Sequence, residues 1–189
     1  VEAVATAALP AMVQLNGTTT VKNSSYFGYG QSYEATSSGT GIIVGKSDTE
    51  LLIVTNAHVV DNIDNLKCVF SDGTSASCSV KGSKSDQDIA VAAVSLSDIS
   101  SDTASNIAIA ELEDSSDIKV GQQVVAIGNA LGEGQSVTTG IISAKDRSIT
   151  VNNVTFTGLL MTDAAINSGN SGGALLNSCL LYTSDAADE

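Results

Sequence analysis

The chain has 189 residues, enough for one large domain or two small ones, and a formal net charge of −13 from 8 basic and 21 acidic side chains. Basic residues are not clustered, which argues against binding to nucleic acid or to an anionic membrane surface, and no apolar stretch is long enough to span a membrane. The 17 glycines, the single proline and the 4% of aromatic residues are typical of a protein built from short strands and tight turns. The chain starts with valine and shows no signal peptide, so we expect it to be a segment of a longer protein.

The N-terminal region predicts a helix that leads into a strand. Apolar residues recur at roughly helical spacing between Val1 and Val13, and Pro10 is expected to bend or start an element there. Residues 16–38 are rich in Ser, Thr, Gly and Tyr without periodicity, so we predict a long surface loop. This loop carries Tyr26, Phe27, Tyr29 and Tyr33. Packing of these aromatic residues back onto the domain and contact with a partner protomer are both open.

A candidate catalytic base follows the next two predicted strands. Thr40–Val44 and Leu51–Thr55 are expected to pair across a turn at Lys46–Thr49. His58, the only histidine in the chain, stands just after the second strand. A lone histidine beside an apolar run is more often a core residue, so this position alone does not establish a base.

Two cysteines lie in a predicted hairpin. Leu66–Phe70 and Ser75–Val80 flank the turn sequence Ser71–Thr74. Alternation along the strands puts Cys68 and Cys78 on the same side of neighbouring strands. A disulfide and two unreactive core thiols are equally compatible with this placement, and no spacing typical of metal ligands occurs.

A carboxylate precedes the following apolar strand. Asp88 stands directly before the run Ile89–Val94. A buried carboxylate is costly unless it is paired, and the N–H of a histidine is a suitable partner. The common alternative for an aspartate in this position is a turn or a helix cap. Asp88 is therefore a candidate partner of His58.

The chain is expected to divide after this strand. Leu96–Asn106, rich in Ser and Asp, is the best candidate for a loop that joins two halves. Further strands are predicted at Ile107–Ala110, Gln123–Ile127, Val137–Ser143, Ser148–Val151 and Leu159–Asp163. The pattern indicates an all-β fold.

A serine between glycines follows the last of these strands, in the sequence Gly169-Asn170-Ser171-Gly172-Gly173. Glycines allow a sharp turn and a close approach of other backbone. A nucleophilic Ser171 needs such a turn, because its hydroxyl must lie beside converging backbone N–H groups. A glycine-rich surface turn is equally compatible with these five residues alone.

Taken together, these segments resemble the HtrA/DegP-type trypsin-like serine proteases. The matching segments are Ser38–Val44, Thr55–Val60, Asp88–Val91, Gly128–Gly132 with Ser136–Ser143, and Gly169–Gly173. The resemblance implies an all-β fold of two six-stranded antiparallel barrels of the trypsin/chymotrypsin-like type, with the catalytic groups in the cleft between them. Residues 1–96 would form the N-terminal barrel with His58 and Asp88. Residues 97–178 would form the C-terminal barrel with Ser171.

The resemblance also implies a serine endopeptidase that cleaves unfolded or damaged polypeptides through an acyl-enzyme. Asp88 would orient His58, and His58 would take the proton of Ser171. The backbone N–H groups of Gly169 and Ser171 would form the oxyanion hole. Ile166 would line the substrate pocket and favour small or medium apolar side chains. No cofactor and no metal would be needed.

In this family the protein would be bacterial and extracytoplasmic, in the cell envelope or secreted. A homotrimer is implied only by the resemblance, as is a membrane anchor or a PDZ domain outside this chain. Ser168 stands where the family often has proline, which loosens the loop but removes no catalytic atom.

The C-terminal end departs from the family. After Asn177 the family continues with a further strand, a specificity loop and a closing helix, whereas residues 179–189 resemble a translated sequencing adapter. We therefore expect a non-native tail and an incomplete second barrel, which would leave this chain weakly active or inactive. The alternatives are a catalytically impaired protease-like module that binds polypeptides, and a structural β-domain in which Ser171 is only a turn residue.

Overall fold

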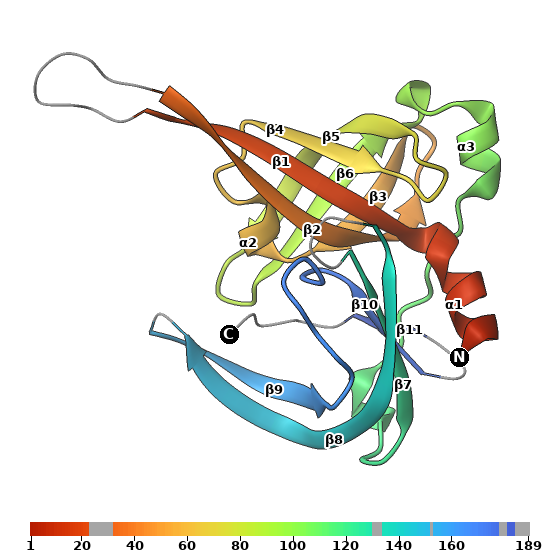
Figure 1. The fold of residues 1–189 in the computed structure, drawn as a ribbon, viewed down its shortest axis with the longest axis vertical. Helices are drawn as coiled ribbons and strands as arrows, with labels where there is room; N and C mark the ends of the chain where they lie inside the picture. The colour runs from red at the N-terminus through yellow and green to blue at the C-terminus, as the bar shows by residue number, and fades with distance from the viewer. Residues whose placement is uncertain (23–31, 130–133, 152, 178–180, 184–189) are drawn as a thin grey trace, which may run out of the picture.

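The structure is a computed structural model that describes residues 1–22, 32–129, 134–151, 153–177 and 181–183 (Figure 1). Its first half is a closed antiparallel barrel with the strand order β1-β2-β3-β6-β5-β4. The strands are β1 (Met12–Lys22), β2 (Ser32–Lys46), β3 (Glu50–Thr55), β4 (Asn65–Val69), β5 (Ser75–Lys84) and β6 (Ile89–Ser95). In β3 the side chains of Leu51, Ile53 and Thr55 alternate into the buried interior. The predicted strands around Lys46–Thr49 and the predicted β4–β5 hairpin are confirmed.

Short helices precede and interrupt the barrel. The α-helix α1 (Glu2–Ala8) and the 3-10 helix η1 (Leu9–Ala11) lead directly into β1, as the N-terminal pattern predicts. Pro10 lies in η1, where its fixed φ suits the start of a helical turn. The single-turn helix α2 (Ala57–Val60) follows β3.

The prediction of a long surface loop over residues 16–38 is wrong in the part that the structure describes. β1 and β2 pair without interruption from Asn16 with Ser38 to Lys22 with Ser32, and the two strands project beyond the barrel (Figure 1). The β-branched run Thr18–Val21 favours extended backbone, but polar residues on both faces hide the two-residue period that reveals a strand. Tyr33 is exposed on β2. Tyr26, Phe27 and Tyr29 lie outside the described residues.

The second half is an open five-stranded sheet in the order β11-β10-β7-β8-β9. Its strands are β7 (Gln123–Gly128), β8 (Ser136–Val151), β9 (Val154–Thr162), β10 (Ala174–Leu176) and β11 (Leu181–Thr183). The predicted strands Val137–Ser143 and Ser148–Val151 are two parts of the single strand β8. An all-β fold with one closed barrel and an incompletely closed second one is therefore confirmed. Of the predicted tail, β11 pairs with β10, and the non-native origin of residues 179–189 stays a prediction.

The segment between the halves differs from its prediction. Leu96–Asn106 is not a plain loop, because it contains the 3-10 helix η2 (Leu96–Asp98) and the helix α3 (Ser101–Asn106). Ser100 caps α3 by accepting a hydrogen bond from the N–H of Thr103, which is why a Ser-rich run can start a helix. Ile107–Ala110 is not a strand. Its N–H groups make isolated bonds to Pro10 and Ile43 rather than a ladder. A third 3-10 helix, η3 (Ser115–Asp117), precedes β7.

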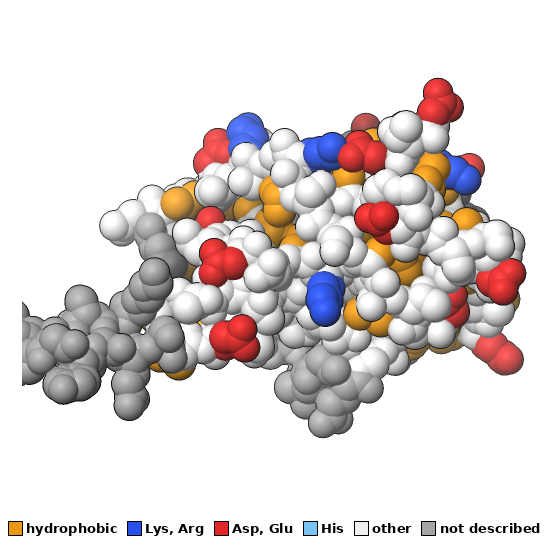
Figure 2. All heavy atoms as spheres, turned by 90° about the horizontal axis from the view of Figure 1, so that it is seen from above, with side chains coloured by type: hydrophobic (Ala, Val, Ile, Leu, Met, Phe, Trp, Pro, Cys, Tyr) orange, Lys and Arg blue, Asp and Glu red, His pale blue; other side chains and the backbone are white. Residues whose placement is uncertain are grey.

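Among the residues that the structure describes, apolar side chains form one cluster inside the barrel, one on the second sheet and one between the halves. The cluster between the halves, here called the seam, contains Ala5, Ala11, Met12, Ile42, Val125, Ile127, Ala174 and Leu176. It combines residues of α1, of the barrel and of the second sheet, so the two halves share a buried interface. Among the described helices, none is both long and apolar enough to cross a membrane. Acidic side chains are scattered over the face shown in Figure 2 rather than gathered in one patch.

Candidate active site

His58 lies on the exposed side of α2. Ala57, Val59 and Val60 are buried, whereas the His58 side chain is 46% exposed. β3 carries the chain to the end of the barrel, and the one turn of α2 then buries its apolar residues and leaves the imidazole accessible. The alternative of a core histidine is therefore excluded.

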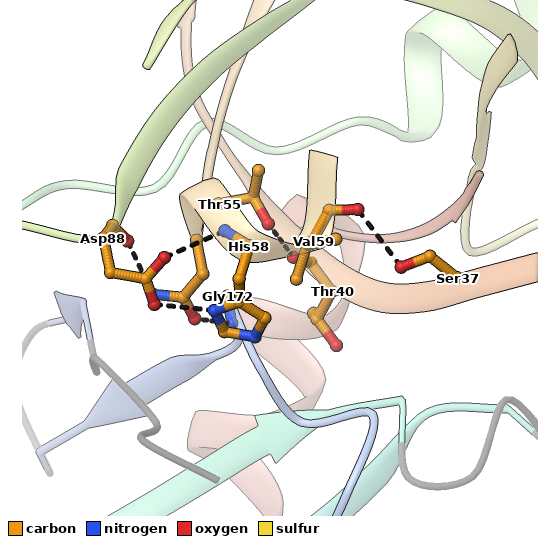
Figure 3. A network of polar contacts seen from close by, with 8 residues as sticks. Ser37, Thr40, Thr55, His58, Val59, Asp88 and Gly172 are labelled. Atoms are coloured by element: carbon orange, nitrogen blue, oxygen red, sulfur yellow. Dashed lines mark hydrogen bonds and ion pairs between the residues drawn. The ribbon is translucent and has the colours of Figure 1, made fainter. Parts of the chain in front are cut away.

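Asp88 binds the segment around His58 with both its side chain and its backbone. Its Oδ2 lies 2.6 Å from Nδ1 of His58, and its Oδ1 accepts a 2.9 Å hydrogen bond from the His58 backbone N–H (Figure 3). Its carbonyl accepts hydrogen bonds from the N–H of Ala57 and from Nδ2 of Asn56. Asp88 adopts a left-handed conformation (φ 50°), which aspartate tolerates better than most residues. Because the carboxylate faces Nδ1, it favours the tautomer with the proton on that nitrogen, and Nε2 is left able to accept a proton.

The segment around Ser171 is a buried turn. The N–H of Asn170 donates to the carbonyl of Asn167, and the N–H of Gly173 donates to the carbonyl of Asn170. Ser171 is only 2% exposed. Gly172 has a φ of 77°, and a Cβ there would lie 2.3 Å from the Thr40 carbonyl oxygen. The glycine at position 172 therefore allows the turn to pack closely against β2 of the first barrel. The alternative of an exposed surface turn is excluded.

Two polar residues of the first barrel hold this turn. Thr40 in β2 donates its backbone N–H to the carbonyl of Ser171 (2.8 Å) and its hydroxyl to the carbonyl of Gly169 (3.0 Å). Asn56, directly after β3, accepts a hydrogen bond from the N–H of Gly172 through Oδ1. Figure 3 shows Thr40, Thr55, His58, Asp88 and Gly172 in one group at the end of the barrel.

These contacts connect the predicted catalytic residues. His58 and Asp88 are in direct contact, and Asn56 joins the Asp88 carbonyl to Gly172, the neighbour of Ser171. Gly169 lies in the same turn. Ile166 is partly buried and packs against the apolar cluster of the second sheet.

Sequence reasoning missed Thr40 and Asn56, which are 1% and 3% exposed. Each is a polar residue close to a run of apolar residues, and Thr40 also stands between Gly39 and Gly41. A buried polar residue requires partners, so this pattern is a usable signal for a structural contact, although it does not identify the partner.

The described residues contain no group of three or more His, Cys, Asp and Glu side chains that could hold a metal ion. Cys68 and Cys78 are free thiols, so of the two alternatives the structure has the unbonded one. They are diagonal neighbours, since Cys68 pairs with Ala76 and Cys78 with Leu66. Burial raises the pKa of Cys78 to about 11 and raises the pKa of Cys68 further, so neither thiol is an activated nucleophile.

Comparison with known proteins gives consistent matches. The family model of the trypsin-like peptidase domain matches residues 39–179. The chain is 37% identical over 177 residues to the serine protease Do-like HtrA of Bacillus subtilis, covering 89% of this chain and 38% of that protein. It is 39% identical over 150 residues to the periplasmic serine endoprotease DegP of Escherichia coli, covering 79% of this chain and 30% of that protein.

Solved structures agree with the sequence matches. The HtrA-type protease AlgWS227A with decapeptide superposes with a TM-score of 0.78 at 31% identity, over 93% of this chain and 54% of that chain. The HtrA-type protease AlgW with tripeptide gives a TM-score of 0.72 at 32% identity, over 92% of this chain and 49% of that chain. The chain spans about a third of the length of the curated relatives named above. The chain therefore belongs to the trypsin-like peptidase domain family, as a domain of the HtrA type.

Proposed function

We propose that the protein is a serine endopeptidase that cleaves unfolded or damaged polypeptides through His58, Asp88 and Ser171. The observation that carries this proposal is the 2.6 Å contact between Nδ1 of His58 and Oδ2 of Asp88, at the point where Asn56 joins Asp88 to the turn of Ser171. An orienting carboxylate, an accessible imidazole and a serine on a tightly held turn are the parts that acyl transfer requires.

The chemical steps follow from these roles. Asp88 keeps the proton on Nδ1 of His58, so Nε2 can take the proton of Ser171 while Oγ attacks the peptide carbonyl. The resulting imidazolium is stabilised by the Asp88 carboxylate and then protonates the leaving amine. The acyl-enzyme is hydrolysed when His58 activates a water molecule in the same way.

The negative oxygen of the tetrahedral intermediate would be bound by the N–H groups of Gly169 and Ser171. A peptide group is planar and trans, so its N–H points away from its carbonyl. Because the Asn170 carbonyl is held by Gly173, the Ser171 N–H points to the opposite side of that peptide. A donor of this kind contributes roughly a hundred- to a thousand-fold in rate. Ile166 would line the pocket for the residue before the cleaved bond and favour small or medium apolar side chains.

Relatives named as periplasmic endoproteases and HtrA-type structures named with bound peptides support an extracytoplasmic protein that acts on polypeptides. A homotrimer stays a prediction from the resemblance, as does a membrane anchor or a PDZ domain outside this chain.

The test is labelling by a fluorophosphonate probe together with hydrolysis of unfolded casein, in the protein with a natural C-terminal end in place of residues 179–189, called the wild type from here on, and in its Ser171→Ala variant. We expect labelling and hydrolysis in the wild type and loss of both in Ser171→Ala. Labelling that survives this substitution would show that another residue is the nucleophile. A folded wild-type protein that binds casein without labelling would instead support an impaired polypeptide-binding module.

A further inference from the structure

We propose that Thr40 is a positioning residue for the oxyanion hole, and that its hydroxyl rather than its methyl group performs this role. This inference rests on the proposed serine endopeptidase function. It concerns a residue of the first barrel that contacts the second half of the chain at three points and does not itself belong to the proposed triad.

The hydroxyl of Thr40 lies between two backbone groups of the second half. It donates to the carbonyl of Gly169 at 3.0 Å and accepts from the N–H of Asn129 at 2.8 Å. The residue is 1% exposed, so water does not readily replace either bond. The hydroxyl therefore links the residue that follows β7 to the start of the proposed oxyanion turn.

The backbone of Thr40 binds the same turn on the other side of the nucleophile. Its N–H donates to the carbonyl of Ser171 at 2.8 Å, and its own carbonyl accepts a 2.6 Å hydrogen bond from the hydroxyl of Thr55. Thr40 is thus held by β3 while it holds the carbonyls of Gly169 and Ser171. The two carbonyls flank the peptide that carries the Ser171 N–H.

The turn needs such an anchor because its first residue is a glycine. Gly169 has a φ of 93° and no Cβ, so its own sterics do not fix the orientation of the following peptide. That peptide is held at its N–H by Asn167 and at its carbonyl by the Thr40 hydroxyl. Without the hydroxyl, rotation about the backbone bonds of Gly169 would change the relative orientation of the Gly169 and Ser171 N–H groups. The two groups could then no longer point at the same oxygen, as the proposed oxyanion hole requires.

A matched set of substitutions separates the hydroxyl from the shape of the side chain. Thr40→Val keeps the branched shape and removes the hydroxyl, whereas Thr40→Ser keeps the hydroxyl and removes the methyl group. For each variant we would measure kcat and KM on a peptide substrate, the affinity for a peptide boronic acid that mimics the tetrahedral intermediate, and the melting temperature.

We expect Thr40→Val to lower kcat roughly a hundredfold, the scale of one lost oxyanion donor, with KM changed by less than about threefold. Affinity for the boronic acid should fall with kcat, because both report binding of the tetrahedral state. Thr40→Ser should stay within about threefold of the wild type in kcat. If Thr40 had a purely structural role, Thr40→Val would instead lower the melting temperature without a selective loss of kcat at nearly constant KM.

Three outcomes would overturn the proposal: unchanged kcat in Thr40→Val, equal losses in Thr40→Val and Thr40→Ser, or lost kcat with unchanged affinity for the boronic acid. If Thr40→Val does not fold, Thr40→Cys replaces it, and this weaker donor must give a lower kcat than Thr40→Ser. A wild-type protein without Ser171-dependent hydrolysis overturns the proposed function as well. An active wild type with an equally active Thr40→Val overturns only the role of Thr40.

Discussion

Asn56 shows how one buried amide can join two parts of the proposed site. Its Nδ2 donates to the Asp88 carbonyl at 2.9 Å, and its Oδ1 accepts from the Gly172 N–H. An amide carries a donor and an acceptor on one rigid plane, so it fixes the spacing of the two groups that it joins. The proposed orienting carboxylate, Asp88, and the turn of the proposed nucleophile are thereby connected through the residue that lies two positions before His58.

Gly172 is the position where a single added methyl group should be most damaging. It combines a φ of 77° with a close approach, because a Cβ would lie 2.3 Å from both the Thr40 carbonyl oxygen and the Thr55 hydroxyl oxygen. Gly121 has a similar φ of 86° but nothing within 4 Å, so it is the matched control.

We expect Gly121→Ala to lower the free energy of unfolding by about 1–2 kcal/mol, the usual cost of a left-handed alanine. Gly172→Ala should cost at least about 2 kcal/mol more and should abolish hydrolysis, because the turn must move away from the barrel. Urea denaturation and casein hydrolysis measure the two effects. Equal losses of stability in the two variants would contradict the importance of the close approach.

The helix α1 is too short to be stable alone, and its role follows from what it covers. Ala5 is its buried residue and belongs to the seam, beside Val125 and Ile127 of β7. Ala7 on the same helix is exposed. α1 therefore closes the interface between the halves with one narrow apolar face.

Ala5→Glu should lower the free energy of unfolding by about 2–4 kcal/mol, because it places an unpaired charge in the seam. Ala7→Glu, with the same change of charge and helix propensity, should stay within about 0.5 kcal/mol of the wild type. Thermal and urea denaturation give both values. Similar stability in the two variants would mean that α1 is not packed on the seam in solution.

The sequence predicted elements well where local contrast is strong. The continuous apolar run of β3, the turn before β5 and the apolar run after Asp88 were sufficient to predict their strands. The long β1–β2 hairpin was missed because threonines on both faces give no contrast. The contacts of Thr40 with Gly169 and Asn129 could not be predicted from the sequence. Gly169 lies 129 positions further along the chain and Asn129 lies 89 positions further, and no local pattern specifies such distant partners.

For the molecule as a whole, the buried thiol of Cys68 and the partly buried thiol of Cys78 predict a loss of stability at alkaline pH. Burial raises the pKa of Cys68 far above its ordinary value of 9.0 and raises the pKa of Cys78 to about 11. Well below pH 9 the folded and the unfolded chain both keep the two thiol protons, so the free energy of unfolding does not change with pH through these groups. Above pH 9 the unfolded chain loses them first and binds fewer protons than the folded protein, so the free energy of unfolding falls as the pH rises.

The expected loss is about 1 kcal/mol per thiol at about pH 10 relative to about pH 8. Cys68→Ala, although less stable overall because of the cavity, should show a shallower decline, and the comparison cancels the titration of tyrosines and lysines. Urea denaturation at a series of pH values measures both curves. Parallel curves for the two proteins would show that the Cys68 thiol ionises equally in both states.

From the bonds of Thr40 we also expect an order of events in folding. The first barrel is complete at Ser95, yet its hold on Gly169 and Ser171 forms only when the chain has been made more than 70 residues further. Such distant contacts close large loops and form late. During synthesis the emerging chain thus carries His58 and Asp88 long before the proposed nucleophile, Ser171, has been made. The proposed proteolytic activity would then be among the last properties that the folding chain acquires.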